Sequence, residues 1–386
     1  MKKGWEITTL GSVCRFVRGP FGGSLKKSVF VEEGFAVYEQ QHAIYDQFEE
    51  IRYFIDDAKF NEMQRFEIQP HDLIMSCSGT MGKVAIVPEG VRRGIINQAL
   101  LKLTPSNNVS PVFLKFWMDS EDFQESLQEQ SGGAAIQNVA SVSVLKEINI
   151  PLPPLEEQQR IVGVLDEAFA GLATAQAHAA QNLQNARALF ESHLQSVFTH
   201  RGKDWVEKRL EDACNEIFAG GDVPKDNHSK VPTEKHQIPI YTNGEKNNGL
   251  YGYTDAARVT APSVTISARG TIGYAAIRNE SYYPAIRLIV AIPNPEMLDV
   301  TFLYYAIENM EIGHSGTSIP QLTVPMVRDF SISFPPLAEQ ERIVTQLDAL
   351  AAETQRLTRL YEQKQAALAA LKKSLLHKHF LENCEL

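Results

Sequence analysis

The sequence predicts a mixed α/β fold, in which two related α/β globular domains are placed about a pseudo-twofold axis and separated by an antiparallel coiled coil of two long helices. Three observations support this prediction. Two long stretches without proline, from Leu155 and from Leu337, have apolar residues at alternating steps of three and four. The segments before them contain short β-branched and aromatic runs separated by glycine, proline and asparagine turns. Landmark residues of the first half also recur, in order, in the second half.

At 386 residues, the chain has room for two or three domains. We expect one globular domain over residues 1–150 and a first long helix within residues 151–200. A second globular domain is expected over residues 201–333, and a second long helix with a short tail within residues 334–386.

The globular domains are predicted from a tandem repeat. The matching landmarks are Trp5, Leu10 and Cys14 with Trp205, Leu210 and Cys214, then Ser76–Gly82 with Ser267–Gly273, and then Phe113 and Leu114 with Phe302 and Leu303. Strand-like runs lie beside the middle landmark, at Lys83–Val87 and Ser263–Ser267. Between landmarks the halves differ, since Phe21–Phe66 has no convincing counterpart in Asp222–Asp255. One scaffold with two different variable surfaces is therefore expected.

The long helices each follow a proline run and share an apolar stripe. In the first helix, from Leu155 to about His200, the stripe is Val162, Leu165, Phe169, Leu172, Gln176, Ala179, Leu183, Ala186, Phe190, His193 and Val197. In the second, from Leu337, it is Ile343, Leu347, Leu350, Thr354, Leu357, Tyr361, Lys364, Leu368, Leu371 and Leu375. A narrow stripe kept over this length is typical of a coiled-coil seam, so each helix needs a partner.

The two helices suit each other as partners, because runs of equal length at about 1.5 Å per residue match end to end. The globular domain between them must reverse the chain, which makes the pairing antiparallel and brings Met1 and Leu386 near each other. The alternative is that the helices belong to separate bundles or contact other chains.

Motif searches predict no catalytic and no metal-binding residue. The chain has no phosphate-binding loop, no metalloprotease motif and no nucleophile elbow, and its cysteines (Cys14, Cys77, Cys214 and Cys384) lack zinc spacing. No apolar run reaches the ~18 residues needed to cross a bilayer, and residues 1–6 lack the apolar stretch of a signal peptide. We expect a cytoplasmic protein with no membrane contact.

The net charge of −10 is unevenly distributed. Between Asp72 and Asp119 the net charge is +4, from Lys83, Arg92, Arg93, Lys102 and Lys115 against Glu89. Between Asp255 and Glu296 it is +3, from Arg258, Arg269, Arg278 and Arg287 against Glu280. These basic windows fall at equivalent places of the repeat, and a basic patch is a typical electrostatic signature of nucleic-acid binding.

Candidate DNA-binding residues lie in two kinds of segment. The Gly-Thr-x-Gly segments are either tight turns between strands or nests of backbone amides that hold a phosphate, and the turn is the more common explanation. Amide-rich stretches can read base edges in a major groove, but they are equally typical of loops. The candidates are Lys26, Lys27, Gln40, Gln41, His42, Gly79, Thr80, Lys83, Arg92, Asn97 and Gln98 in the first half, and Tyr241, Asn243, Lys246, Asn247, Arg269, Gly270, Thr271, Arg278 and Arg287 in the second.

These features resemble a known family. The segments Pro153–Val162 and Pro335–Val344 both have the pattern Pro-Pro-Leu-x-Glu-Gln-x-Arg-Ile-Val, each half opens on Trp-x-x-x-x-Leu, and each has Ser-x-x-Gly-Thr-x-Gly in its middle. Together, over the whole chain, they resemble the specificity subunit of type I restriction-modification systems.

The resemblance implies two target-recognition domains, each reading one part of a split double-stranded DNA sequence. It also implies a complex with two methylation subunits, which modify adenine with S-adenosylmethionine, and two restriction and translocase subunits, which use ATP and Mg²⁺. The chain itself would then be non-catalytic and need no cofactor. One alternative is a stand-alone DNA-modifying enzyme with an atypical site. The other is a coiled-coil adaptor without a DNA role, which would not require basic windows at equivalent positions of both globular domains.

Overall fold

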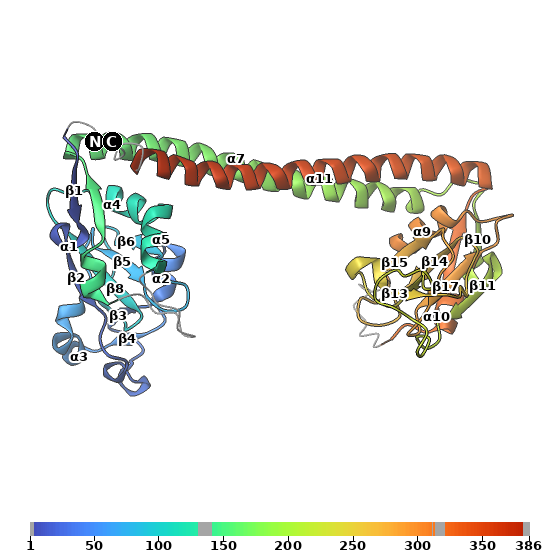
Figure 1. The fold of residues 1–386 in the computed structure, drawn as a ribbon, viewed down its shortest axis with the longest axis horizontal. Helices are drawn as coiled ribbons and strands as arrows, with labels where there is room; N and C mark the ends of the chain where they lie inside the picture. Colours follow the sequence, from blue (N-terminus) through green and yellow to red (C-terminus); the bar gives the residue numbers. More distant parts are fainter. Residues whose placement is uncertain (1–3, 130–140, 311, 313–320, 381–386) are drawn as a thin grey trace. The chain divides into compact units, whose positions relative to one another are not determined.

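The computed structural model describes residues 4–129, 141–310, 312 and 321–380. The chain forms two compact units, unit 1 (Met1–Ala179 and Gln363–Leu386) and unit 2 (Ala180–Glu362). Each unit therefore contains one globular domain and half of each long helix (Figure 1). Both ends of the described chain belong to unit 1, whereas Met1, Leu386 and Cys384 lie outside the described residues.

The globular domain of unit 1 alternates short strands and helices. Its first elements are β1 (Glu6–Thr9), α1 (Leu10–Val13), β2 (Cys14–Arg18), and the 3₁₀ turns η1 (Gly22–Ser24) and η2 (Lys27–Val29). Next come β3 (Phe35–Tyr38), α2 (Gln40–Tyr45), β4 (Phe54–Ile55), α3 (Asp57–Glu62) and η3 (Gln64–Phe66). The last are β5 (Leu73–Ser76), β6 (Val84–Ile86), β7 (Gly94–Ile96), β8 (Leu100–Pro105), α4 (Pro111–Met118), α5 (Glu121–Glu129), α6 (Val142–Lys146) and β9 (Asn149–Leu152).

Three small sheets organise unit 1. A four-stranded antiparallel sheet has the order β2-β8-β5-β6, a three-stranded sheet has the order β4-β3-β7 with β3 parallel to β7, and β1 pairs with β9. All four residues of β5 are buried, as expected for a central strand covered on both faces. The largest core cluster joins β5, β8, α4 and α5 to Ile161 and Leu165 of the first long helix and to Phe380 of the second.

Unit 2 repeats this architecture. Its elements are β10 (Val206–Arg209), α8 (Leu210–Ala213), β11 (Cys214–Ala219), β12 (Ile238–Tyr241), η4 (Lys246–Gly249), β13 (Leu250–Thr254), β14 (Ser263–Ile266), β15 (Ala275–Arg278), β16 (Tyr283–Pro284), β17 (Ile289–Pro293), α9 (Val300–Asn309), α10 (Val324–Arg328) and β18 (Ser331–Phe334). The sheet orders are β11-β17-β14-β15, β13-β12-β16 and β10-β18. Each sheet has its equivalent in unit 1, which confirms the predicted tandem repeat.

One detail of the predicted repeat was wrong. Phe21–Phe66 and Asp222–Asp255 do share a framework, because β12 pairs with a parallel β16 and an antiparallel β13 as β3 pairs with β7 and β4. Only the connections differ, since α2 and α3 of unit 1 are replaced by η4 and loops in unit 2. Sequence comparison missed this because strands β12 and β13 each span only four or five residues.

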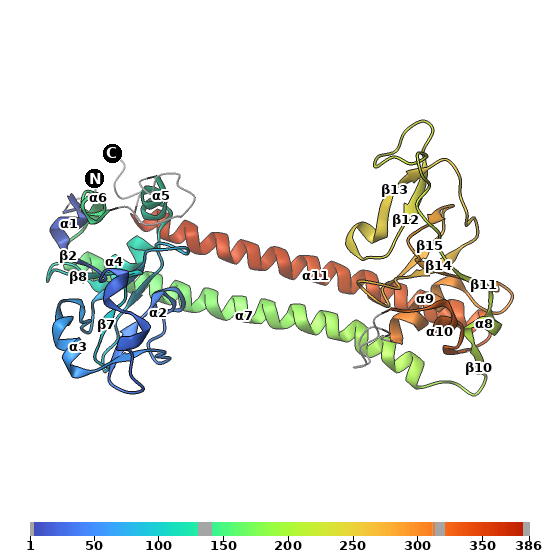
Figure 2. The ribbon, with the colours of Figure 1, turned by 90° about the horizontal axis from the view of Figure 1, so that it is seen from below.

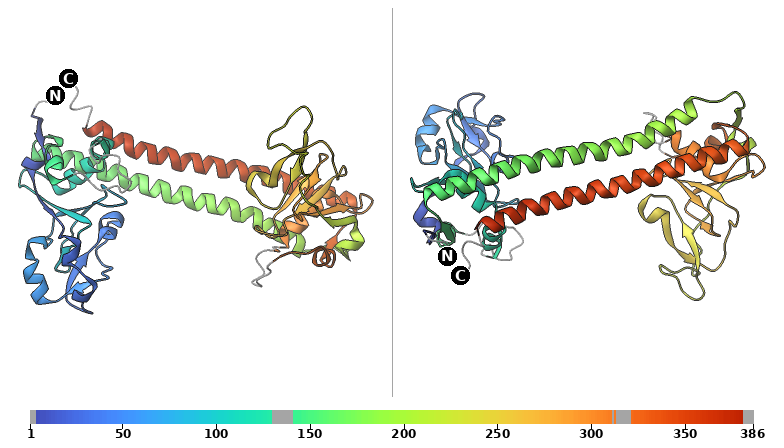
Figure 3. Two further views of the ribbon diagram at one scale, coloured as in Figure 1. Left: turned by 60° about the horizontal axis from the view of Figure 1, so that its bottom comes forward. Right: turned by 90° about the horizontal axis from the view of Figure 1, so that it is seen from above.

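The two long helices are α7 (Leu155–Thr199) and α11 (Leu337–Phe380), which confirms the predicted pair. In unit 1, the first half of α7 packs with the last half of α11, and in unit 2 the last half of α7 packs with the first half of α11 (Figures 2 and 3). The pairing is thus antiparallel within each unit. In unit 2, an ion pair of 3.2 Å between Arg187 and Glu362 links the two helices.

Three residues of the predicted stripe are exposed instead. These are His193 on α7 and Lys364 and Leu371 on α11. On α7, the buried or half-buried positions toward the end of the helix follow consecutive steps of four, at Ala186, Phe190, Leu194 and Phe198. On α11, Gln365 is half-buried beside the exposed Lys364, and the last buried positions are Leu376 and Phe380, while the exposed Lys372 places its ammonium over the Phe169 ring. An undistorted helix of 3.6 residues per turn drifts by about 20° per heptad from a strict 3.5-residue repeat, so an added step of four brings the stripe back to the same face.

The glutamine of the repeated Pro-Pro-Leu-x-Glu-Gln motif is a fully buried clamp in both units. Gln158 accepts a hydrogen bond from the backbone N–H of Ser110 (2.8 Å) and donates to two carbonyl oxygens, of Asn108 and Pro153. Gln340 makes the same three contacts in unit 2, with the N–H of Asp299 and the carbonyls of Met297 and Pro335. The motif therefore fixes the start of each long helix against the start of α4 or α9.

None of the helices in the described parts of the chain is long and apolar enough to span a bilayer.

Candidate nucleic-acid interface

The Gly-Thr-x-Gly segment of unit 1 is a tight loop between β5 and β6. Its base is closed by hydrogen bonds from the Gly82 N–H to the Ser76 carbonyl (2.9 Å) and from the Lys83 N–H to the Ser76 hydroxyl (3.0 Å). Gly79 has φ +64° with open space around it, so glycine is needed there for its backbone conformation rather than for close packing. The loop presents Gly79, Thr80 and Lys83 to solvent.

Unit 2 has the same loop between β14 and β15. The Gly273 N–H donates to the Ser267 carbonyl (2.9 Å), and Gly270 has φ +73° with open space around it. Arg269, Gly270 and Thr271 are exposed. The expected turn between strands is thus confirmed in both units, and the exposed tips keep their phosphate-binding role as a prediction.

An amide side chain that follows the central strand of the small sheet anchors each loop. Gln40, two residues after Tyr38 of β3, accepts a hydrogen bond from the Ser78 N–H (2.9 Å). Asn243, two residues after Tyr241 of β12, accepts from the Ala268 N–H (2.7 Å) and donates to the Ile286 carbonyl (2.6 Å). These two amides therefore hold the loops in place, a role that the sequence prediction missed.

A third segment joins each loop from the turn before β8 or β17. In unit 1 the Cys77 N–H donates to the Ala99 carbonyl and the Gly19 N–H to the Leu100 carbonyl (both 2.9 Å). A Cβ on Gly19 would lie 1.8 Å from the Asn97 carbonyl oxygen, so only glycine fits. In unit 2, Gly220 donates in the same way to the Leu288 carbonyl (2.8 Å).

These contacts define one surface per unit, which we call its loop face. The loop face of unit 1 comprises residues 18–24, 39–41, 76–83 and 97–99. The loop face of unit 2 comprises residues 219–222, 241–248, 267–274 and 285–287. Both faces have the same construction, but apart from the glycine turns their exposed side chains differ.

The structure separates the candidate residues into three groups. On the loop faces and at least partly exposed are Gln41, Gly79, Thr80, Lys83, Asn97, Gln98, Lys246, Asn247, Arg269, Gly270, Thr271 and Arg287. Used within the fold are Gln40, His42, Tyr241, Asn243 and Arg278. Outside the segments that define the loop faces are Lys26 and Lys27, exposed around η2, and Arg92, which covers the Phe54 ring and precedes β7.

His42 has a structural role. Its side chain is fully buried, one ring nitrogen contacts the Glu39 N–H (2.8 Å), and the other contacts the Glu50 carbonyl (3.1 Å). The predicted DNA contact of His42 is therefore not supported, because no part of its ring reaches the surface.

Several basic side chains of the two windows are buried or paired with carboxylates inside the protein. Lys102 is 4% exposed, donates to the Glu67 carbonyl and lies 3.7 Å from the Asp72 carboxylate, and burial lowers the pKa of its ammonium. Arg93 pairs with Glu67 (2.9 Å) and Lys115 with Asp119 (3.2 Å). Of the first window, Lys83 alone lies on the loop face of unit 1.

Arg278 of the second window is also internal. It is 2% exposed, its guanidinium donates to the Asn248 carbonyl (2.7 Å) and the Thr265 hydroxyl (3.2 Å), and it lies 3.6 Å from the centre of the Tyr241 ring. Burial lowers the pKa of this guanidinium. The predicted DNA contact of Arg278 is thus replaced by a role inside unit 2, where it supports the loop that presents Lys246 and Asn247.

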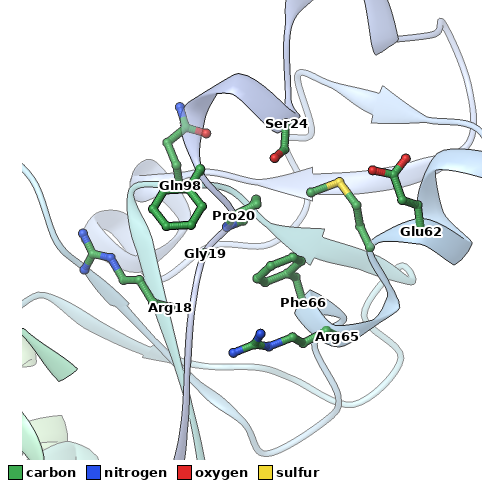
Figure 4. Close-up of a pocket in the computed structure, with 10 residues that line it drawn as sticks. Arg18, Gly19, Pro20, Ser24, Glu62, Arg65, Phe66 and Gln98 are labelled. Carbon is green, nitrogen blue, oxygen red and sulfur yellow. The ribbon is translucent and has the colours of Figure 1, made fainter. Parts of the chain in front are cut away.

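A depression of about 520 Å³ lies at the edge of the loop face of unit 1. Figure 4 shows the guanidinium groups of Arg18 and Arg65 on one side of Phe66 and the carboxylate of Glu62 on the other. Arg18 also lies beside Cys77, whose thiol has its pKa raised to about 12 by burial. The sequence prediction missed Arg18 and Arg65, because both lie outside the windows of net positive charge.

Within the described residues, the side chains of His, Cys, Asp and Glu form no group of three or more with the geometry to hold a metal ion.

Comparison with known proteins identifies the family. A family model described as the type I restriction modification DNA specificity domain matches residues 2–181 and 202–366. A putative type I specificity subunit of Mycoplasma pneumoniae is 31% identical over 207 residues, which are 54% of this chain and 56% of that relative. A second one from the same organism is 30% identical over 270 residues, 66% of this chain and 76% of the relative. The chain thus matches just over half the length of the first relative.

Two solved structures share the fold over nearly the whole chain. A chain from a study of complex assembly and conformational transition of the type I R-M system superimposes with a TM-score of 0.81 at 21% identity, covering 98% of both chains. The HsdS subunit from Thermoanaerobacter tengcongensis superimposes with a TM-score of 0.66 at 21% identity, covering 99% of this chain and 98% of that one. Since the family model matches both globular domains and most of the chain, this protein belongs to the type I restriction-modification DNA specificity family.

Proposed function

We propose that each unit binds one half of a bipartite double-stranded DNA target through its loop face. The supporting observation is that the same four segments build an exposed surface in both units, while the residues presented there differ. A surface built twice with different side chains suits the recognition of two different short sequences. Other DNA-recognition folds likewise keep their scaffold and vary the residues that contact bases.

Two kinds of contact are proposed for each loop face. The exposed Gly-Thr tips, with Lys83 in unit 1 and Arg269 in unit 2, contact phosphates and set the position of the duplex. Arg269 is held for this purpose by Gln321, whose side-chain oxygen accepts from its Nε (3.1 Å) and Nη2 (2.7 Å). The exposed amides Gln98 and Asn247 contact base edges and supply sequence information.

The loop that carries Asn247 is suited to this task. Asn247 and Asn248 both have left-handed backbone conformations, with φ of 51° and 55°. The Asn248 side chain accepts a hydrogen bond from the Tyr274 hydroxyl (2.9 Å), and its carbonyl accepts from Arg278. A loop held in this way presents Asn247 with little loss of conformational entropy on binding.

The long helices are proposed to set the gap between half-sites and to bind two methylation subunits. Adenine methylation with S-adenosylmethionine, and restriction with ATP and Mg²⁺ by two further subunits, would occur in those partners, so this chain is proposed to be non-catalytic and to need no cofactor. Because such partners and chromosomal DNA share one compartment, we also propose a cytoplasmic location.

The proposal is tested by mapping methylated adenines in cells that express the chain with its methylation subunit. Gln98→Ala should relax the sequence of one half-site and Asn247→Ala that of the other, with the gap unchanged. Lys208→Ala, an exposed residue on β10 outside both loop faces, is the control and should leave the target unaltered. Variants that each change both half-sites would contradict the assignment of one half-site to each unit.

A further inference from the structure

Phe21 is an exposed aromatic residue on the loop face of unit 1. Its side chain is 92% exposed, whereas the next most exposed large apolar side chain in the described chain, Tyr45, is 74% exposed. Leaving a phenylalanine in water forgoes roughly 2 kcal/mol of burial free energy. Single exposed apolar residues are common on proteins, so the exposure alone does not indicate a function.

The backbone around Phe21 is fixed from both sides. Before it, Gly19 is hydrogen-bonded to Leu100 and fits closely against Asn97, and the buried Pro20 restricts its own φ. After it, the Phe21 carbonyl accepts a hydrogen bond from the Ser24 N–H (2.8 Å), which closes the turn η1. The ring is therefore held outward by an anchored turn.

Polar and cationic groups surround the base of this turn. Phe21 lines the same depression as Arg18, Arg65 and Gln98. Figure 4 shows the last three of these residues. An exposed ring at a depression that two arginines also line suits a partner that has phosphates beside flat apolar surfaces. Duplex DNA has both, because its base pairs expose flat faces wherever a base step opens.

Unit 2 has no equivalent of this ring. Gly220 makes the same hydrogen bond as Gly19, so the residues that follow, Gly221 and Asp222, correspond to Pro20 and Phe21. The Gly221 carbonyl accepts a hydrogen bond from the Ile286 N–H (2.7 Å), which keeps the chain against the neighbouring turn. At the position of the ring, unit 2 has a carboxylate, which phosphates repel.

We propose that Phe21 is a wedge that inserts at one base step of the half-site bound by unit 1 and opens the stack there. Arg18 and Arg65 contact the phosphates on either side of that step. The proposal rests on the DNA-binding role proposed above and adds an asymmetry to it: the half-site of unit 1 is distorted and the half-site of unit 2 is not. Proteins commonly open base steps with inserted Phe, Leu, Ile or Met side chains.

The test uses the chain in complex with its methylation subunits and a duplex that contains the mapped target. The fluorescent base 2-aminopurine is placed, one position at a time, in both half-sites, leaving out the adenine that is methylated. Binding by the wild-type complex should raise fluorescence at one step of the unit 1 half-site and at none of the unit 2 half-site. Phe21→Ala should abolish that signal and weaken binding by about 5- to 100-fold, in the range measured for loss of one stacking contact.

Two variants serve as controls. Phe21→Leu should keep most of the fluorescence signal, because leucine also acts as a wedge. Val31→Ala removes an apolar side chain that is 39% exposed near the opposite end of β3, and it should leave both binding and signal unchanged.

Several outcomes overturn the wedge. The first is unchanged affinity and fluorescence in Phe21→Ala, and the second is an equal fluorescence signal in both half-sites. The third is loss of the methylation subunits from the Phe21→Ala complex, which would show that Phe21 contacts protein rather than DNA. If the wild-type complex does not distinguish the target from a scrambled duplex, the proposed DNA-binding role fails first, and the wedge fails with it.

Discussion

Units 1 and 2 each bury a basic side chain within the strand framework, Lys102 and Arg278, but they neutralise it differently. In unit 1, Lys102 on β8 lies beside the buried carboxylate of Asp72, which also accepts from the Thr104 hydroxyl (2.5 Å) and the Gln69 N–H (2.9 Å). In unit 2, Arg278 on β15 is bound by uncharged partners, a carbonyl, a hydroxyl and an aromatic ring. The strand framework is therefore common to both units, whereas the polar groups buried within it are not.

The largest expected effect follows from this difference. Lys102→Met leaves the Asp72 carboxylate buried without a cation and should destabilise unit 1 by about 3–5 kcal/mol. Arg278→Met leaves no buried charge. It should lower the free energy of unfolding of unit 2 by about 1–3 kcal/mol, because the Asn248 carbonyl and the Thr265 hydroxyl lose a hydrogen-bond donor. Hydrogen exchange, followed separately for the β5 and β14 amides, measures the two losses.

A double variant checks the cause. Lys102→Met combined with Asp72→Asn removes both charges and should recover a large part of the lost stability, because the amide oxygen still accepts from the Gln69 N–H and the amide NH2 can donate to the Thr104 hydroxyl. If the double variant is no more stable than Lys102→Met alone, lost packing rather than an unpaired charge explains the effect.

Variants of Asn243 and Gln40, the amides that anchor the loops, should cause a loss of binding free energy of intermediate size. Asn243 makes two hydrogen bonds to backbone groups of its loop face, and Gln40 makes one. Asn243→Leu should therefore weaken the binding of the assembled complex to its half-site by about 1–3 kcal/mol, and Gln40→Leu by about half of that. Titration of duplexes in which only one half-site is correct separates the two effects. Equal losses at both half-sites would show that the anchors do not act locally.

The smallest expected effect concerns the exposed phosphate contacts. Lys83→Met and Arg269→Met should each reduce the slope of log affinity against log salt by about one unit, and weaken binding to all sequences alike. Lys208→Met, outside both loop faces, should leave the slope unchanged. An unchanged slope in the first two variants would remove the loop tips from the interface.

The sequence predicted the large-scale architecture because long helices have a periodic signal. The start of α7 and α11, their antiparallel pairing and the repeat of the globular domains all follow from the apolar stripe and from landmarks such as Trp5 and Trp205. His193, Lys364 and Leu371 are exposed because the strict alternation of steps of three and four was extended past the points where the helices shift their covered positions by one residue, as from His193 to Leu194 and from Lys364 to Gln365.

The candidate site was predictable only in part. The Gly-Thr-x-Gly loops stand out because both glycines of each motif adopt a positive φ, which restricts the residue type. Lys102 and Arg278 were counted as surface charges because charge windows contain no information on burial. Gln40 and Asn243 act through partners about 40 and 25 residues away, which a local pattern does not reveal. Phe21 has no sequence signal of exposure, since an aromatic residue is more often buried.

The most direct test of the account separates sequence reading from spacing. Four residues inserted after Ala179, with a matched insertion after Tyr361, lengthen both helices by about 6 Å near the boundary of the two units, which equals one to two base pairs. The variant is expressed with its methylation subunit, and methylated adenines are mapped across the genome. Unchanged half-sites with a gap longer by one or two base pairs are expected. The original gap, or altered half-sites, would contradict the claim that the units read sequence and the helices set their separation.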